Sequence, residues 1–528
     1  MSTPLDEQLK SILGAERVQF GLAEREFFST DLYSAGATCA AVVRPADAQM
    51  LAATVAAATR AGYAVVPRGG GLTYVGGYTP PHSQTITVDC ADLNRIIEVN
   101  SDDMYISVEA GVTWKQIDEA LSPLGLRLPF FGTFSGASAT VGGGLSNGAM
   151  FLGSARYGSA AETVLGMEIA LADGTLLQTG HGAVTRTQKP VYRSFGPDIT
   201  GLFVHDCGAF GIKTKATLRV ISAPQDLGYL SFLFATIDQA AQAMSEIARR
   251  DLVEEIYIVD PIRTRQRLHE GNLLGDLKML GKVVGKEKGL LRGLQSGLEL
   301  IKGGKNFLDQ DLYSLHMVCA GRSRAAVDSD LTACADIARR LAGTEIPNSI
   351  PKATRAMPFP ALDSVLGASG DRWVALNCKI AHSEAAKLLA GTEAIFTRFK
   401  PELDAAGVVV TVLISAMGNH VFSYECVFRW FDRWLPPHKA IHPNIDRFVE
   451  PPDNPSAREA IARTRQAVVD FFYEIGAASA QIGRTYRYLD ALTPEARGLL
   501  VDLKQLLDSG QHLNPGVLGF GVPQQGNV

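Results

Sequence analysis

The stretch 65–80 reads V-V-P-R-G-G-G-L-T-Y-V-G-G-Y-T-P. It contains the glycines Gly69, Gly70, Gly71, Gly76 and Gly77. An alanine-rich segment, 46–61, precedes it and stops at Gly62, which predicts a helix with a glycine at its C-terminus. Residues 63–66 then form a short apolar strand. A strand that leads into a loop with few side chains leaves successive N–H groups free to bind an anion, and Arg68 adds positive charge. The alternative is a tight connection between two strands.

Two common phosphate-binding motifs do not fit this loop. A Rossmann loop needs G-x-G-x-x-G at the start of a helix, but residues 72–75 and 79–81 read L-T-Y-V and T-P-P, which open no helix. A Walker loop needs a terminal Gly-Lys-Ser/Thr, which is absent here. If the loop holds a pyrophosphate, it does so in another fold.

The bulk composition is that of a globular enzyme. The chain has 528 residues, 46% hydrophobic and 20% charged, with a net charge of -5. This length predicts at least two domains, and the charge gives no case for nucleic-acid binding. The N-terminus lacks an apolar signal core, and the longest apolar run, 408–417, is too short to span a bilayer. Seven cysteines without a C-x-x-C pair indicate reduced thiols and a cytoplasmic protein.

A second stretch of small residues, 132–148, reads G-T-F-S-G-A-S-A-T-V-G-G-G-L-S-N-G. It can fill little core volume and offers backbone donors and hydroxyl groups instead. Because ordinary connections are short, two such stretches about sixty residues apart are not expected to be two accidental loops. Together they predict an enclosure for a long, polar, phosphate-bearing ligand.

Residues 38–221 resemble the FAD-binding domain of the vanillyl-alcohol oxidase/p-cresol methylhydroxylase superfamily. The resemblance rests on P-R-G-G-G-L-T-Y-V-G-G, L-N-R-I-I-E-V-N with V-E-A-G-V-T-W, A-T-V-G-G-G-L-S-N, L-G-M-E-I-A-L-A-D-G and G-P-D-I-T-G-L-F with G-A-F-G-I-K-T, in the expected order. It implies an α+β chain with a two-subdomain PCMH-type FAD-binding domain, 1–222 completed by 471–528. It also implies an α+β cap domain with an antiparallel sheet, 223–470, which covers the flavin and shapes the substrate cavity.

The resemblance also implies which residues contact FAD. Those around the pyrophosphate are Pro67, Arg68, Gly69, Gly70, Gly71, Leu72, Thr73, Gly76 and Gly77. Those near the isoalloxazine and ribityl groups are Gly136, Ser138, Thr140, Val141, Gly142, Gly143, Asn147, Tyr157 and Gly158. Gly211 and Ile212 would offer backbone contacts to the adenosine half. We expect dissociable FAD, because relatives with a histidyl link carry His in the phosphate loop, which here reads Leu72-Thr73.

Two segments of the cap and its return carry candidate catalytic residues. If 420–428 is a strand, its period of two places His420, Phe422 and Tyr424 on one face, where they could form a substrate wall. Histidine is the usual base near neutral pH. The alternative is that His420 is a hydrogen-bonded structural residue and the rings are core.

The second segment, 481–490, resembles the Tyr-Arg-Thr segment of the phenol-oxidising branch. Arg484 matches, but Gly483 stands where that branch has Tyr, as Thr140 and Val75 stand where it has Asp and Tyr. Tyr486 is a candidate substitute for the missing phenol. Arg484 either holds a substrate carboxylate, which its fork geometry suits, or forms a structural ion pair.

The metal-binding hydroxyacid dehydrogenases carry paired histidines and a Glu-His-Gly-Ile-Gly segment. Residues 479–483 here read S-A-Q-I-G, so we expect no catalytic metal. Residues 278–305 form a basic amphipathic segment. Its alternatives are a peripheral membrane contact, a solvated excursion of the cap, or an oligomer contact.

The sequence therefore predicts an FAD-dependent oxidoreductase that acts on a small alcohol, either para-hydroxybenzylic or phenolic or a hydroxycarboxylate. Electrons would pass to oxygen, a cytochrome or a quinone, and the resemblance implies a homodimer. The alternatives are a 2-hydroxyacid dehydrogenase that uses a quinone or cytochrome, and a flavin-binding electron-transfer subunit without a substrate of its own.

Overall fold

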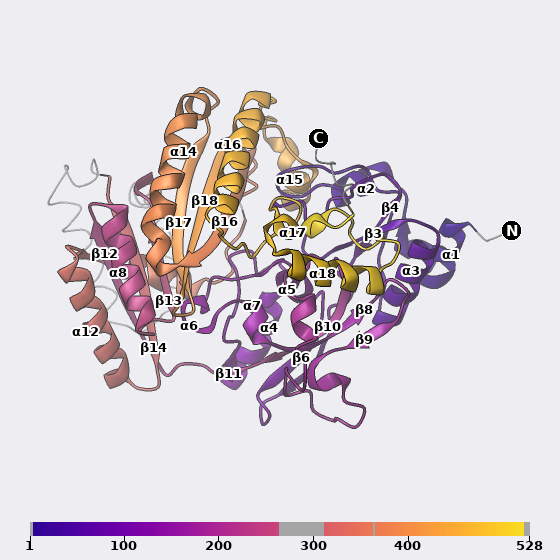
Figure 1. The fold of residues 1–528 in the computed structure, drawn as a ribbon, viewed down its shortest axis with the longest axis horizontal. Coiled ribbons are helices and arrows are strands. Elements are labelled where there is room, and N and C mark those ends of the chain that lie inside the picture. Colours follow the sequence, from indigo (N-terminus) through magenta and orange to yellow (C-terminus); the bar gives the residue numbers. More distant parts are fainter. Residues whose placement is uncertain (1–3, 263–310, 363–364, 522–528) are drawn as a thin grey trace.

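The structure, a computed structural model, describes residues 4–262, 311–362 and 365–521. Three larger sheets and a short pair, β7 (Leu126–Arg127) with β11 (Ile221–Ser222), organise this part of the chain. Two of the larger sheets belong to the N-terminal region and the third to the middle of the chain (Figure 1).

The first sheet has the order β1-β2-β4-β3. Its strands are β1 (Val18–Gln19), β2 (Ala41–Val43), β4 (Thr85–Asp89) and β3 (Ala64–Arg68). Strands β2 and β3 both run parallel to β4, because helix α3 (Ala48–Arg60) makes the crossover between them. Asp47 begins this helix by accepting a hydrogen bond from Met50 N at 2.8 Å, and Gly62 follows it at φ 76°. Helices α1 (Leu5–Leu13) and α2 (Leu22–Phe28) complete this subdomain.

The second sheet is antiparallel, with the order β5-β6-β10-β8-β9. Its strands are β5 (Ile96–Asn100), β6 (Tyr105–Glu109), β10 (Ile212–Arg219), β8 (Val164–Ala170) and β9 (Leu176–Gln178). Its helices are α4 (Trp114–Leu121), α5 (Val141–Ser146), α6 (Ser154–Tyr157) and α7 (Ala160–Thr163). Trp114 is fully buried, and a Cβ at Gly144 would lie 2.5 Å from its ring. The glycine run of α5 therefore lets this helix approach α4 closely.

The third sheet is antiparallel throughout, with the order β15-β12-β14-β13-β17-β18-β16. Its strands are β15 (Thr344–Ile346), β12 (Asp226–Phe234), β14 (Tyr313–Gly321), β13 (Glu255–Val259), β17 (Val409–Met417), β18 (Val421–Phe431) and β16 (Asp371–Ala381). All of them fall within 223–470, the range predicted for the cap domain. We call this sheet and its helices the cap.

Four long helices lie side by side along the cap sheet (Figure 1). They are α8 (Ile237–Arg249), α12 (Arg324–Arg340), α14 (Ala385–Ala405) and α16 (Pro455–Glu474). Their buried residues form one core with the strands. The short helices α13 (Ser349–Ala356) and α15 (Pro436–Ile441) lie in connections.

The C-terminal segment returns to the first sheet after α17 (Tyr488–Ala491) and α18 (Pro494–Leu507). Val65 N donates to His512 O at 2.8 Å, and Asn514 N donates to Val65 O at 2.9 Å. The end of the chain therefore lies directly beside β3, the strand that leads into the glycine loop.

No helix of the described residues is long and apolar enough to cross a membrane. Within 4–262, 311–362 and 365–521, no cluster of three or more His, Cys, Asp or Glu side chains could hold a metal ion. The proposed membrane-contact segment, 278–305, lies outside the described residues.

Candidate active site

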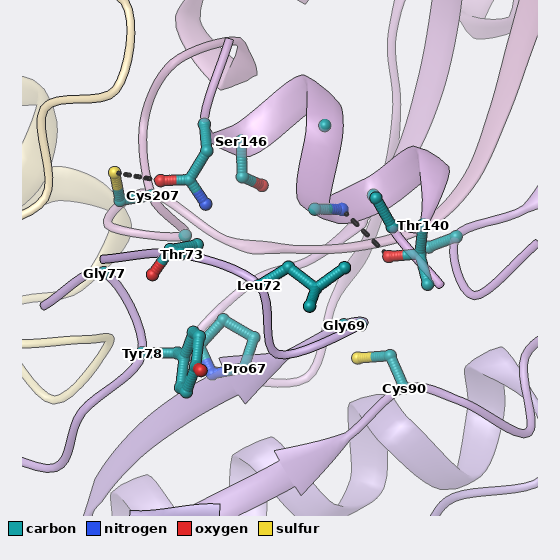
Figure 2. Close-up of a pocket in the computed structure, with 18 of the residues that line it drawn as sticks. Pro67, Gly69, Leu72, Thr73, Gly77, Tyr78, Cys90, Thr140, Ser146 and Cys207 are labelled. Carbon is teal, nitrogen blue, oxygen red and sulfur yellow. Dashed lines mark hydrogen bonds between the residues drawn. The ribbon is translucent and has the colours of Figure 1, made fainter. Parts of the chain in front are cut away.

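A cavity opens to solvent between the two N-terminal subdomains. The glycine loop after β3 forms one side, and α5 with the segment 207–213 forms the other (Figure 2). Gln481 from the C-terminal return also lines the cavity.

The loop presents a row of unpaired backbone donors. In the described part of the chain, no protein acceptor receives a hydrogen bond from the N–H groups of residues 69–73, and the Thr73 hydroxyl, which is buried, also lacks a partner. Successive unpaired N–H groups beside a cavity therefore indicate an anionic ligand such as a pyrophosphate.

Gly76 keeps the far end of this loop in place. Its N–H donates to Asp31 Oδ2 at 2.9 Å, and its carbonyl oxygen accepts a hydrogen bond from Arg484 Nη1. Asp31 is fully buried and also accepts from the N–H groups of Tyr33 and Ser34. Burial raises the pKa of Asp31, although these three N–H donors oppose the effect. Gly76 thus supports the loop from below and does not line the cavity.

Arg68 lies beneath the loop, outside the cavity. Its guanidinium carbon is 4.5, 4.3 and 5.3 Å from the ring centres of Phe27, Phe28 and Tyr78. A Cβ at Gly71 would lie 2.3 Å from Arg68 Nη2, so the charge sits directly under the backbone of the loop. The prediction that Arg68 reaches the ligand is wrong; it supplies positive potential from below.

In the second glycine stretch, the N–H groups of residues 141–143 are already hydrogen-bonded within the protein. The N–H groups of Val141 and Gly142 bind the carbonyl oxygens of Val112 and Ala110, both at 2.8 Å. Gly143 N donates to Thr140 Oγ1 at 3.3 Å. A Cβ at Gly142 would lie 2.8 Å from the Ala110 side chain. The expectation that this stretch offers free backbone donors is therefore wrong for the start of α5.

Most of the residues predicted to contact FAD line the cavity. They are Pro67, Gly69, Gly70, Gly71, Leu72, Thr73, Gly77, Thr140, Gly142, Gly143, Asn147, Gly211 and Ile212. Figure 2 shows Leu72 pointing into the space between the loop and Thr140. Their arrangement, glycine backbone on one side and small residues on the other, fits a dinucleotide.

The other predicted residues do not line it. Val141 is fully buried in the core of the second subdomain. A Cβ at Gly136 would meet the Phe359 ring, and one at Gly158 would meet Glu162. Tyr157 lies near Arg127, whose guanidinium carbon is 5.6 Å from its ring, and the side chain of Ser138 is exposed. For Gly136, Ser138 and Val141 a sequence neighbour lines the cavity instead, whereas Tyr157 and Gly158 lie in a segment that does not reach it.

Comparisons with known proteins agree with this geometry. Residues 39–180 match the family described as "FAD binding domain". The structure resembles p-cresol methylhydroxylase with a TM-score of 0.74 and 16% identity, covering 98% of this chain and 96% of that one. It resembles the 4-ethylphenol oxidase of Gulosibacter chungangensis with a TM-score of 0.70 and 17% identity, covering 98% and 96%. Residues 39–180 thus match an FAD-binding domain, and the chain shares its fold with these two PCMH-type flavoproteins.

Curated relatives match part of the chain. A mitochondrial D-lactate dehydrogenase [cytochrome] of Saccharomyces cerevisiae is 33% identical over 187 residues, 35% of this chain and 30% of that protein. A D-lactate dehydrogenase of Archaeoglobus fulgidus is 31% identical over 212 residues, 40% and 45% of the two chains. The glycolate oxidase subunit GlcD of Bacillus subtilis is 27% identical over 248 residues, 47% and 51%. The matches thus span about a third to a half of these relatives.

Sequence reasoning missed several groups of the FAD cavity. Lys213 and Asp206 form a buried ion pair of 2.6 Å at its wall. Cys90 and Cys207 also line it, and burial raises the pKa of each thiol to about 12, so both stay neutral near pH 7. The position of Lys213, two residues after the glycine Gly211 on an alternating strand, could have indicated it.

Tyr424 does not face the flavin domain. Phe422 and Tyr424 share a face of β18, as the period of two predicts, but that face lies against the cap helices. The Tyr424 ring is 6.4 Å from Phe472 of α16, and its hydroxyl bonds to Thr392 of α14. The opposite face looks toward the flavin domain, as the contact of Ser423 Oγ with Met150 Sδ at 4.0 Å shows.

His420 is also not where the sequence predicted. It precedes β18 in the turn after β17, is exposed, and its ring has one hydrogen bond, between Nδ1 and Asn419 Oδ1 at 3.3 Å. The strand begins one residue later than expected, so the imidazole belongs to the hairpin turn and not to a substrate wall.

Arg484 is a structural clamp. Besides Gly76 O, its guanidinium donates to Asn514 Oδ1 at 2.9 Å and Pro515 O at 2.7 Å. Burial lowers its pKa to about 10. It connects the glycine loop to the C-terminal segment, so neither a carboxylate-binding role nor an ion pair describes it.

Tyr486 lies between the two domains. Its hydroxyl accepts a hydrogen bond from Asn377 N of β16 at 2.7 Å. Burial raises the pKa of this phenol. The neighbouring Tyr74 ring packs edge-on against Trp373 at 4.8 Å, and its hydroxyl bonds to the Gln481 side chain. The cap therefore contacts the flavin domain beside the part of the cavity wall that Thr73 and Gln481 form.

Proposed function

We propose that this chain is an FAD-dependent oxidoreductase that oxidises a small hydroxy compound at a CH–OH group. The observation that carries the proposal is the row of unpaired N–H groups at residues 69–73, beside a cavity that the cap adjoins at Gln481. A pyrophosphate accepts such donors, and the cap offers a second, protein-lined surface for a substrate.

Bound FAD would supply a hydride acceptor for the oxidation of a substrate carbon that carries a hydroxyl group. The residues 69–73 would hold its pyrophosphate, while Gly142, Gly143 and Asn147 face the cofactor from the other subdomain. The contact of Tyr74 with Trp373 and Gln481 closes the junction between loop and cap and excludes water from it. A dry site strengthens the electrostatic interactions that orient a polar substrate.

The curated relatives favour a hydroxycarboxylate over a phenolic alcohol as the substrate. The names of the relatives quoted above include D-lactate and glycolate. A phenol-oxidising site is less well supported, since Arg484 serves the backbone and Gly483 provides no phenol. The electron acceptor is oxygen, a cytochrome or a quinone.

The seven cysteines are free, buried thiols, which supports a reducing, cytoplasmic setting for the enzyme. A homodimer, and a membrane contact through residues 278–305, stay predictions. The FAD is proposed to be dissociable, because the cavity wall offers Leu72 and Thr73 beside the loop, and its two thiols are held neutral by burial.

An anaerobic titration of the purified yellow protein tests the proposal. The panel contains 2-hydroxyacids, 4-hydroxybenzyl alcohols and 4-alkylphenols, and the readout is loss of the oxidised flavin absorbance. Bleaching by one class identifies the substrate type, and readmitted air separates an oxidase from a dehydrogenase. If flavin is bound but no compound bleaches it, the protein is an electron-transfer subunit and the proposal fails. Acid precipitation that leaves the flavin in the pellet would contradict dissociable binding.

A further inference from the structure

The cap presents a buried lysine without a counter-ion next to the flavin domain. The described chain has three buried lysines: Lys213, Lys379 and Lys504. Lys213 pairs with Asp206 and Lys504 with Asp508, each at 2.6 Å. Lys379 has no carboxylate oxygen within 4.0 Å in the described residues.

An unpaired buried cation is costly, because burial removes its hydration. Burial lowers the pKa of Lys379, and Glu425 opposes this only from beyond ion-pair distance. The one hydrogen bond of Nζ goes to Asn377 Oδ1 at 3.1 Å. Two of its three donors are therefore available to a ligand.

Asn377 adds a second available donor. Its Oδ1 accepts hydrogen bonds from Lys379 Nζ at 3.1 Å and Ala480 N at 3.4 Å, which fixes the orientation of the amide. The Nδ2 atom is buried and has no acceptor, and the residue is 3% exposed. An ammonium and an amide N–H₂ held side by side, both short of acceptors, match the two oxygens of a carboxylate.

Lys379 and Asn377 lie where β16 contacts the segment 478–481, which leads into the wall of the FAD cavity. Lys379 N donates to Ala478 O at 2.8 Å, and Ala478 N donates back to Lys379 O at 3.1 Å. Ser479 Oγ donates to Asn377 O at 2.9 Å. Two residues later, Gln481 lines the cavity. On β18, the cross-strand partner of Lys379 is Ser423, which contacts the flavin domain through Met150.

We propose that Lys379 and Asn377 bind the acidic group of the substrate and so select a hydroxycarboxylate over a neutral alcohol. This inference rests on the proposed function, because it names the substrate class of the same site. A carboxylate satisfies the ammonium and the amide together, whereas a neutral alcohol leaves a buried cation without a counter-ion. Sites built to bind a polar group reject ligands that lack it by large factors.

The test uses oxalate, a redox-inert dianion, titrated into the FAD-loaded protein and followed by flavin absorbance and calorimetry. Lys379→Met is expected to weaken oxalate binding by about 10- to 100-fold, the value of a charge-assisted hydrogen bond. Lys387→Met, which changes an exposed lysine of α14, is the matched control and should leave the affinity unchanged. Oxamide, the neutral diamide, should bind the wild-type protein weakly. It should bind both variants with the same weak affinity.

A second variant keeps the test informative if Lys379→Met folds poorly. Asn377→Asp places a permanent carboxylate beside Lys379 Nζ and is expected to weaken oxalate by at least about tenfold while FAD stays bound. Oxalate affinity within threefold of wild type in both variants would overturn the proposal. So would a shift of the flavin reduction potential in Lys379→Met without loss of oxalate binding, since the pair would then serve the cofactor.

The two proposals fail in different ways. If neutral alcohols bleach the flavin and hydroxycarboxylates do not, the oxidoreductase proposal stands and the Lys379–Asn377 assignment is wrong. If oxalate binds through this pair but no compound bleaches the flavin, the anion site stands and the proposed oxidation fails.

Discussion

Arg484 binds the carbonyl oxygen of Gly76, a residue 408 positions earlier in the chain. The same guanidinium holds Asn514 and Pro515, so one side chain joins the glycine loop to the C-terminal segment. Asn514 strengthens this junction, because its Nδ2 donates to Gly77 O at 2.7 Å and Cys207 O at 2.6 Å. The shape of the FAD loop therefore depends on residues at the far end of the sequence.

We expect Arg484→Met to lower the free energy of unfolding by about 2–3 kcal/mol, because it leaves three partly buried acceptors without their charged donor. The variant should also lose FAD during gel filtration. Arg487→Met is the control: Arg487 is 45% exposed and 3.6 Å from Asp470, a surface pair worth less than about 1 kcal/mol. Thermal melts with and without added FAD provide the measurement. A destabilisation of Arg484→Met no larger than that of the control would show that the clamp is dispensable.

Gly70 lies at a close contact between the two subdomains. A Cβ there would lie 2.1 Å from Ser138 O, a backbone atom that cannot move aside easily. We expect Gly70→Ala to weaken FAD binding about 10- to 100-fold, since overpacking of this size displaces the loop. Equilibrium dialysis with FAD measures the effect.

The control for this substitution is Gly498→Ala in α18, where a Cβ meets no atom within 4 Å. It should bind FAD normally and be slightly more stable, by about 0.5–1 kcal/mol, because alanine favours a helix. Normal FAD affinity in Gly70→Ala would contradict the role of this close approach.

The FAD-binding architecture could be predicted from the sequence, because its signals are local. The helix before Gly62, the strand 63–66 and the glycine loop follow each other directly, and the loop lines the cavity as expected. Some residues predicted to contact FAD do not line the cavity. Two of them, Arg68 and Val141, are sequence neighbours of glycines that do line it. Sequence alone does not report on which side of the backbone such a neighbour lies.

The substrate side of the site could not be predicted in this way. A period of two shows that Phe422 and Tyr424 share a face, but both faces of β18 carry buried residues, so the pattern does not say which face meets the flavin domain. Lys379 and Asn377 are two residues apart on β16, but the contact that holds the Asn377 amide against Ala480 joins residues 103 positions apart. Nothing local to either residue marks them as a site.

Tyr424→Phe tests this assignment of faces. Because the hydroxyl bonds only within the cap core, we expect a loss of about 1 kcal/mol in stability and no change in the rate of flavin bleaching. His420→Ala should likewise bleach at the wild-type rate, since its side chain is exposed in a turn. Anaerobic stopped-flow absorbance with the best substrate of the panel measures both. A tenfold slower reduction of the flavin in either variant would support the sequence-based prediction that this residue lines the substrate site.

A buried charge network joins the cap to the flavin domain and should respond to acid. Glu254 is 2.5 Å from Arg127 and 2.8 Å from Arg355, and Glu255 also binds Arg355. Burial opposes ionisation of Glu254, but the charges of Arg355 and Arg127 outweigh it and hold its pKa below the ordinary value of 4.5. For Glu255 burial dominates and raises the pKa.

The two carboxyl groups therefore predict opposite pH effects. A depressed pKa gives stability that is present above about pH 4.5 and lost as the pH falls through the folded-state value, so Glu254 makes the protein acid-sensitive. A raised pKa means that the folded state binds the proton first, so Glu255 adds stability on acidification. Glu254→Gln should cost about 3–5 kcal/mol near neutral pH, because two buried guanidinium groups lose their shared charge, and should flatten the decline in acid.

Urea unfolding of the FAD-loaded protein between about pH 7 and pH 4 measures both slopes. Glu255→Gln is the matched variant, with the same change of charge at the next residue, and its stability should decline more steeply in acid than that of wild type. Parallel pH profiles for the two variants would contradict the opposite pKa shifts. A Glu254→Gln protein as stable as wild type at neutral pH would show that the network does not hold the cap to the flavin domain.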